Sequence, residues 1–177
     1  MRSVEISNKY PRLLIDRERV EALVETLDLH ATRFEGGCPE GELSLAFVSD
    51  PALAKLHEKF FDDPSITDVI TFEGEPAFGV AGEVCVSVDT AQRYAAENGR
   101  GFSEELSLYV IHGWLHLAGY DDLKPELKRA MRRAEARAEK ILRPLGLLAA
   151  FELKDTVKKQ AKKHAKATPL RRSKQQG

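Results

Sequence analysis

Residues 103–119, "SEELSLYVIHGWLHLAG", constrain the fold more than any other stretch, because they predict a helix that carries core-directed apolar residues and two histidines. Ser103, followed by two glutamates, predicts the amino-terminal cap, and Gly119 predicts the turn that ends the helix. Leu115, Leu117 and the residues before them predict faces directed at the core. The segment therefore predicts a central helix.

Strand and helix patterns alternate before this helix, and a further helix pattern follows it. Strands are expected at residues 3–8, 42–49, 67–72 and 82–89, where apolar and β-branched residues alternate or cluster. Further helices are expected at residues 16–31, 51–61, 89–98 and 125–143. This order predicts a single-domain α+β fold, with a mixed sheet of about four strands and about five helices. The last helix is expected to cover part of the sheet.

Aspartates are expected to start two of these helices. Asp50 precedes Pro51, a residue suited to the first helical position. Asp89 precedes Gln92 by three residues, the spacing of a capping box. Asp50 and Asp89 are therefore the predicted N-caps of the helices that follow them.

Charge is distributed unevenly along the chain. Residues 152–177 carry nine Lys or Arg and two acids, a net charge of +7, whereas residues 1–151 carry a net charge of −8. The sequence predicts a folded domain over residues 1–150 and a basic, disordered tail over residues 151–177. Such a tail favours contact with a polyanion such as RNA, and the alternative is a solvated tail without a partner.

Cysteine usage and hydropathy bear on location. Cys38 and Cys85 are far apart and neither belongs to a Cys-x-x-Cys pair, which is typical of proteins in a reducing compartment. No apolar run is long enough for a membrane span, and the first twenty residues lack the apolar region of a signal peptide. A cytoplasmic location without membrane contact is expected.

Two histidines at the end of the central helix predict a metal site. His112 and His116 are four residues apart, so that their rings lie on one face of a helix, one turn apart. A sharp turn at Gly119 would bring residues 120–122 back towards that face. Asp122 is then the expected third ligand, and two histidines with one carboxylate suit zinc as well as other divalent ions.

Two neighbouring residues bear on the reactions that this site could catalyse. Asp121 is either a turn residue or a partner that orients one of the histidines. Gly113 stands where a zinc peptidase of the His-Glu-x-x-His type needs its general base, so a peptidase is disfavoured.

The stretch "HGWLHLAGYDD", residues 112–122, closely resembles the H-G-x-L-H-L-x-G-Y-D-H signature of the YbeY family of bacterial rRNA maturation factors. The stretches "LHEKFFDDPSITDVITF" at 56–72 and "GEVCVSVDTAQRYAAENG" at 82–99 are also similar to segments of that family. The resemblance covers roughly residues 3–147. It implies that His112 and His116 are zinc ligands, and that Thr67 and Asp68 lie near the substrate, although a cap at the start of a strand would also explain this pair.

This sequence departs from the family pattern at two positions. Asp122 occupies the place of the third histidine, and Phe61 occupies the place of an arginine that assists phosphate handling. Phenylalanine cannot pair with phosphate. Arg93, Arg100 or a lysine of the tail could replace that arginine, and the sequence does not decide between them.

The resemblance implies a zinc-dependent endoribonuclease that cleaves single-stranded RNA. Its expected role is maturation of the 3′ end of 16S rRNA and ribosome quality control, at or near the small ribosomal subunit. The basic tail would provide a further contact with rRNA, through Lys158, Lys159, Lys162, Lys163, Arg171 and Arg172. The two departures leave open a binding factor that has kept the fold and lost catalysis, and a metallohydrolase with another substrate is the third alternative.

Overall fold

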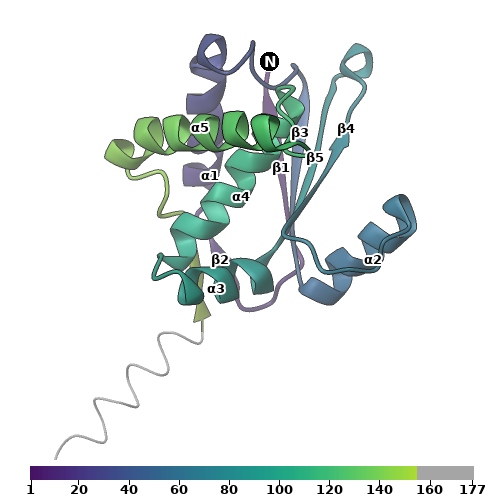
Figure 1. The fold of residues 1–177 in the computed structure, drawn as a ribbon. Coiled ribbons are helices and arrows are strands. Elements are labelled where there is room, and N and C mark those ends of the chain that lie inside the picture. The colour runs from purple at the N-terminus through teal and green to yellow at the C-terminus, as the bar shows by residue number, and fades with distance from the viewer. Residues whose placement is uncertain (155–177) are drawn as a thin grey trace, which may run out of the picture.

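The structure is a computed structural model that describes residues 1–154, and it forms one α+β domain (Figure 1). The main sheet has the strand order β1-β3-β5-β4. β1 and β3 run parallel to β5, and β4 is antiparallel to it, so the sheet is mixed as predicted. Its strands are β1 (Ser3–Asn8), β3 (Glu42–Val48), β4 (Val69–Glu73) and β5 (Val80–Ser87).

Within residues 1–154, five α-helices pack around this sheet, in agreement with the predicted number. They are α1 (Arg17–Leu29), α2 (Asp50–Phe61), α3 (Val88–Glu97), α4 (Phe102–Leu117) and α5 (Pro125–Leu142). Short 3-10 turns occupy Ala31–Arg33, Pro76–Phe78 and Arg143–Leu145. No helix within residues 1–154 is both long and apolar enough to cross a membrane.

The two faces of the sheet bury different sets of side chains, because successive residues of a strand point to opposite faces. Leu43, Leu45 and Phe47 belong to the large core that β3 shares with α1, α4 and α5. Ala46 and Val48, the alternate residues, belong to a smaller cluster beneath α2. In Figure 1, α2 accordingly lies on one side of the sheet while α1, α4 and α5 lie on the other.

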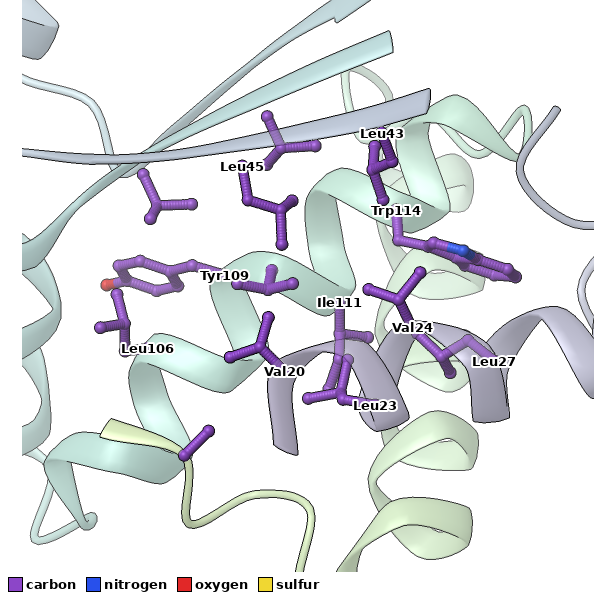
Figure 2. Close-up of a cluster of buried hydrophobic side chains, with 14 of the residues drawn as sticks. Val20, Leu23, Val24, Leu27, Leu43, Leu45, Leu106, Tyr109, Ile111 and Trp114 are labelled. Atoms are coloured by element: carbon purple, nitrogen blue, oxygen red, sulfur yellow. The ribbon is translucent and has the colours of Figure 1, made fainter. Parts of the chain in front are cut away.

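α4 lies at the centre of the large core, as the sequence predicts, and ten of its residues are buried. Figure 2 shows Leu106, Tyr109, Ile111 and Trp114 of this helix among the side chains of α1 and β3. Trp114 is fully buried, and its indole N–H donates to Asp28 of α1 over 3.0 Å. A buried indole with a satisfied donor fixes the position of α4 along α1.

A glycine allows α4 to approach the sheet closely. A Cβ atom at Gly113 would overlap the side chain of Val84 on β5, with Cγ2 of Val84 at 2.8 Å. Position 113 is therefore closed to the glutamate that a zinc peptidase would need there, for a steric reason.

The structure corrects the predicted helix caps. Ser49, not Asp50, caps α2 by accepting a hydrogen bond from the N–H of Ala52, and Ser87, not Asp89, caps α3. α4 begins at Phe102, with Gly101 as the capping residue. The hydroxyl of Ser103 donates instead to the carbonyl of Leu148. In each case the candidate side chain is used in a tertiary contact.

A second, two-stranded sheet was not predicted. β2 (Leu13–Ile15) pairs antiparallel with β6 (Phe151–Leu153). The tail was expected to begin at residue 151, but residues 151–153 form this strand, and Phe151 and Leu153 are buried because they pack against the core. The remaining predicted tail, with its lysines and arginines from residue 158 onwards, lies outside the described residues.

α5 packs mainly on α4 and α1 rather than on the sheet, contrary to the expectation for residues 125–143. Its buried face consists of Met131, Ala134, Ala138 and Leu142. Ala134 and Ala138 on this face let α5 cross α4 closely (Figure 1), and the neighbouring Glu135 reaches His112 of α4 over 2.6 Å. This crossing brings α5 to the candidate site described next.

Candidate metal centre

A glycine-ended helix terminus shapes the backbone of the site. The N–H of Gly119 donates to the carbonyl of His116, and the N–H of Tyr120 donates to that of Leu115, both over 3.0 Å. These two bonds form a Schellman motif, which requires a left-handed residue, and Gly119 has a φ of 105°. The chain reverses here, as predicted, and Asp122 returns to the histidine face.

The Nδ1 atom of each histidine forms a hydrogen bond. His112 Nδ1 lies 2.6 Å from Oε1 of Glu135 on α5, and His116 Nδ1 lies 3.0 Å from the carbonyl oxygen of Tyr120. An acceptor at Nδ1 places the proton there and leaves the lone pair on Nε2. Both rings therefore present Nε2 to the same point.

Three ligand atoms converge at that point. The two Nε2 atoms are 3.0 Å apart, and Asp122 has Oδ2 at 3.5 Å from Nε2 of His112 and Oδ1 at 3.7 Å from Nε2 of His116. Tetrahedral zinc with bonds of about 2.0–2.1 Å separates its ligand atoms by about 3.3 Å. The spacing of this His-His-Asp group thus fits a zinc ion, and the group could hold a metal ion.

Burial and nearby charge shift the pKa values of the two histidines in opposite directions. Burial lowers the pKa of His112, but the hydrogen bond and charge of Glu135 outweigh it, and the pKa is raised. Burial and the neighbouring His112 lower the pKa of His116. His116 is therefore biased towards its neutral, ligating form, while Glu135 holds the His112 proton on the side away from the ligand cluster.

The site opens into a cleft of about 610 Å³. His112 and Asp122 line this cleft together with Thr67 and Asp68, so the structure brings two of the three predicted ligands and the predicted substrate-binding pair to one cavity. Asp68 also accepts the N–H of Val69 over 2.9 Å at the start of β4, which is the capping role considered as the alternative.

Two roles were predicted for Asp121, and the structure shows that it acts as a turn residue. Its carboxylate accepts the N–H groups of Asp122 and Leu123, at 2.7 and 3.2 Å. The residue that orients a histidine is Glu135, which the sequence reasoning missed. The signal was weak: Glu135 lies on an amphipathic helix, but nothing in the sequence shows that this helix crosses α4 at His112.

The structure also places the residues considered for phosphate binding. Phe61 is about half exposed at the end of α2, where it packs on Phe72, and it does not line the cleft. Arg93 lines the cleft but is held by Asp50 at 3.0 Å. Arg100 contacts two carboxylates, Glu105 at 3.1 Å and Glu139 at 2.7 Å.

An α+β domain with a His-His-Asp group that could hold a metal ion, beside a cleft that His112 and Asp122 line, defines the class of proteins with a candidate single-metal site. The family model "Endoribonuclease YbeY" matches residues 5–146. The chain therefore belongs to the endoribonuclease YbeY family, as the resemblance implied.

Individual relatives agree with this assignment. An endoribonuclease YbeY of Chlamydia pneumoniae is 39% identical over 75% of this chain and 85% of its own length. One of Desulforamulus reducens is 33% identical over 82% of this chain and 98% of its own length. A solution structure of a Thermotoga maritima protein matches with a TM-score of 0.53 and 25% identity, over 82% of this chain and 95% of that one.

Proposed function

We propose that this protein is a metal-dependent endoribonuclease that cleaves single-stranded RNA. One observation carries the proposal: in a member of the endoribonuclease YbeY family, two Nε2 atoms and a carboxylate converge beside a cleft with both Nδ1 atoms held by acceptors. Relatives named as endoribonucleases support an RNA substrate.

Zinc is the proposed metal, at one ion per chain, with His112, His116 and Asp122 as ligands. Two nitrogen donors and one oxygen donor suit zinc, and His112 and Asp122 of this group line the cleft. A bound zinc ion would supply a Lewis acid that polarises a phosphate oxygen or lowers the pKa of water.

The side chains around the ligands have separate proposed tasks. Glu135 and the Tyr120 carbonyl keep the imidazoles in a fixed tautomer and orientation. Thr67 and Asp68, which line the same cleft, are proposed to position the RNA strand. The catalytic role of His112 and His116 is exerted through the metal that they hold.

The proposed biological substrate is rRNA. Maturation of the 3′ end of 16S rRNA and ribosome quality control, at the small ribosomal subunit in the cytoplasm, follow from the family resemblance. The basic residues 155–177 are proposed to provide a further contact with RNA, since their charge is opposite to that of the phosphate backbone.

A second candidate function is a ribosome-associated factor that binds rRNA without cleaving it. Two observations favour it: Asp122 replaces a neutral nitrogen ligand by a charged oxygen ligand, and Phe61 supplies no phosphate contact. Metal-loaded wild-type protein that binds rRNA and leaves it intact would establish this alternative.

A cleavage assay with a fluorescent single-stranded RNA distinguishes the two proposed functions. We expect cleavage by the wild type, loss of cleavage on addition of a chelator, recovery with zinc, and loss in His116→Ala. His30→Ala is the matched control, because His30 bonds to the carbonyl of Thr26 on α1 and does not line the cleft. Cleavage that continues unchanged with chelator and in His116→Ala would contradict metal dependence.

A further inference from the structure

The amino-terminal half of α5 carries an unusually basic surface. Residues 124–133 hold a single acid, Glu126, and five exposed cations: Lys124, Lys128, Arg129, Arg132 and Arg133. The folded part of the chain is otherwise acidic, with a net charge of −8 over residues 1–151. A local concentration of positive charge on an acidic domain favours a polyanionic ligand at this place.

Two of these cations face the candidate site. Lys128 and Arg132 line the same cleft as His112, Asp122 and Glu135. Residues 128, 132 and 135 follow the spacing i, i+4, i+7, so one face of α5 presents two cations beside the carboxylate that orients His112. Arg129 and Arg133 are also exposed, but they do not line the cleft.

Neither Lys128 nor Arg132 has a carboxylate partner within residues 1–154 at hydrogen-bond or ion-pair distance. The nearby acids on α5 are engaged elsewhere: Glu135 bonds to His112, and Glu139 contacts Arg100 and Arg143. Like charges at i and i+4 destabilise a helix slightly. The folded domain thus holds two cations at the edge of the cleft without neutralising them.

The other candidate cations are already neutralised. Arg93 donates to Asp50 and to the hydroxyl of Thr90, and Arg100 lies between two carboxylates. Phe61 lies outside the cleft. Lys128 and Arg132 are therefore the cleft-lining cations of residues 1–154 that remain available to an anion.

We propose that Lys128 and Arg132 bind backbone phosphates of the RNA strand beside the His112–His116–Asp122 group, and so provide the phosphate contacts that Phe61 cannot make. This proposal rests on the proposed function, because it assumes an RNA substrate. The planar guanidinium of Arg132 can engage a phosphate through two parallel N–H···O bonds, and the Lys128 ammonium adds a point charge one turn away. Both are positioning residues for the strand.

The test is RNA binding without cleavage. A fluorescein-labelled oligouridylate is titrated with protein in chelator at several salt concentrations. In the double variant Lys128→Gln, Arg132→Gln we expect the Kd to rise about tenfold or more at low salt, and the slope of log Kd against log salt to fall by about 1.4, or about 0.7 per phosphate contact. Each single variant is expected to reduce the slope by about half of that amount.

The matched control is the double variant Arg129→Gln, Arg133→Gln, which removes the same charge from the same helix outside the cleft. We expect its Kd to change less than about threefold, because it removes only long-range attraction. The charge-preserving pair Lys128→Arg, Arg132→Lys is expected to bind within about threefold of wild type. All exchanged side chains are exposed, so folding should be retained, as circular dichroism would verify.

Equal losses of affinity in the cleft-facing and control variants would overturn the proposal, since they would show a general field effect. Unchanged binding in the cleft-facing variant would also overturn it, and wild-type cleavage of RNA in a separate metal-loaded assay would then leave the proposed function standing. Wild-type protein that neither binds nor cleaves RNA would overturn both.

Discussion

Asp122, the third proposed ligand, occupies the position of a histidine in the family signature that this chain resembles. Its carboxylate lies 3.5 and 3.7 Å from the two Nε2 atoms, so it is placed to complete the site. An anionic ligand adds negative charge to the site and would make a bound metal a weaker Lewis acid than three neutral ligands would.

We predict that purified wild-type protein contains about one zinc per chain and that Asp122→Ala loses most of it, because two ligands hold zinc much more weakly than three. Asp122→His is the matched variant, and it is expected to keep its zinc. The measurement is elemental analysis after gel filtration. Zinc retained equally in Asp122→Ala would show that another group completes the site.

Glu135 acts on the site through His112. Glu135→Ala is expected to weaken zinc binding about 10- to 100-fold, because the imidazole loses the acceptor that fixes its tautomer. Glu135→Gln keeps a hydrogen-bond acceptor without the charge and should weaken binding less. Competition with a chromophoric chelator measures the affinity, with Glu126→Gln as an exposed control on the same helix. Equal zinc affinities of Glu135→Ala and the control would refute the proposal that Glu135 orients His112.

At the scale of elements, the position of α4 depends on its packing against β5 at Gly113. We predict that Gly113→Ala lowers the free energy of unfolding by about 1–3 kcal/mol, because the added methyl overlaps Val84 and forces the helix from the sheet. Urea denaturation gives the free energy. Gly101→Ala is the comparison: a Cβ there meets nothing closer than 3.7 Å, so we expect only the loss of a favourable N-cap, at most about 1 kcal/mol. Similar destabilisation of both variants would argue against the close approach.

Asp50 joins the start of α2 to α3. Its carboxylate accepts hydrogen bonds from Thr90 at 2.6 Å, from Arg93 at 3.0 Å and from the hydroxyl of Ser87. Burial raises the pKa of Asp50, but these bonds outweigh it, and the pKa is lowered below its ordinary value. A lowered pKa in the folded state stabilises the protein above the ordinary pKa of aspartate, and this stabilisation is lost as the pH falls through the lower, folded-state pKa.

Asp50→Asn is therefore expected to cost about 2 kcal/mol of stability near neutral pH. The difference between variant and wild type should shrink below about pH 4, where aspartates begin to take up protons. Urea denaturation at several pH values measures both effects. A difference that stays constant down to low pH would contradict the role of the ionised carboxylate.

At the scale of the whole molecule, an acidic domain is joined to a basic carboxyl-terminal segment. Residues 155–177 carry eight Lys or Arg and one acid. We predict that removing them reduces the salt dependence of RNA binding by about 0.7 in slope for each phosphate that the segment neutralises, while β6 and the fold remain. Fluorescence anisotropy of single-stranded RNA at several salt concentrations measures this slope. A steep salt dependence that survives the deletion would refute the binding of RNA by the tail.

Much of the architecture could be predicted from periodicity, because an apolar face must be buried whatever it packs against. The four strands of the main sheet and all five helices follow from such patterns. β2 and β6 could not be predicted, since three residues are too few for a periodic signal and their pairing joins positions 13–15 to 151–153. The predicted caps were wrong for a related reason: a serine lies within two residues of the aspartate at both helix starts, and the hydrogen bond between Asp50 and Ser87 is a tertiary contact that the local sequence does not reveal.

The sequence by itself determined the local part of the site. Helix geometry alone sets the i, i+4 spacing of His112 and His116, and backbone sterics alone favour the left-handed turn at Gly119. The approach of Asp122 to the histidines could therefore be predicted from residues 112–122. Only the tertiary structure decided what surrounds them. Glu135, Lys128 and Arg132 reach the cleft because α5 crosses α4, and such long-range packing depends on the fit of whole helix faces, which no local pattern encodes.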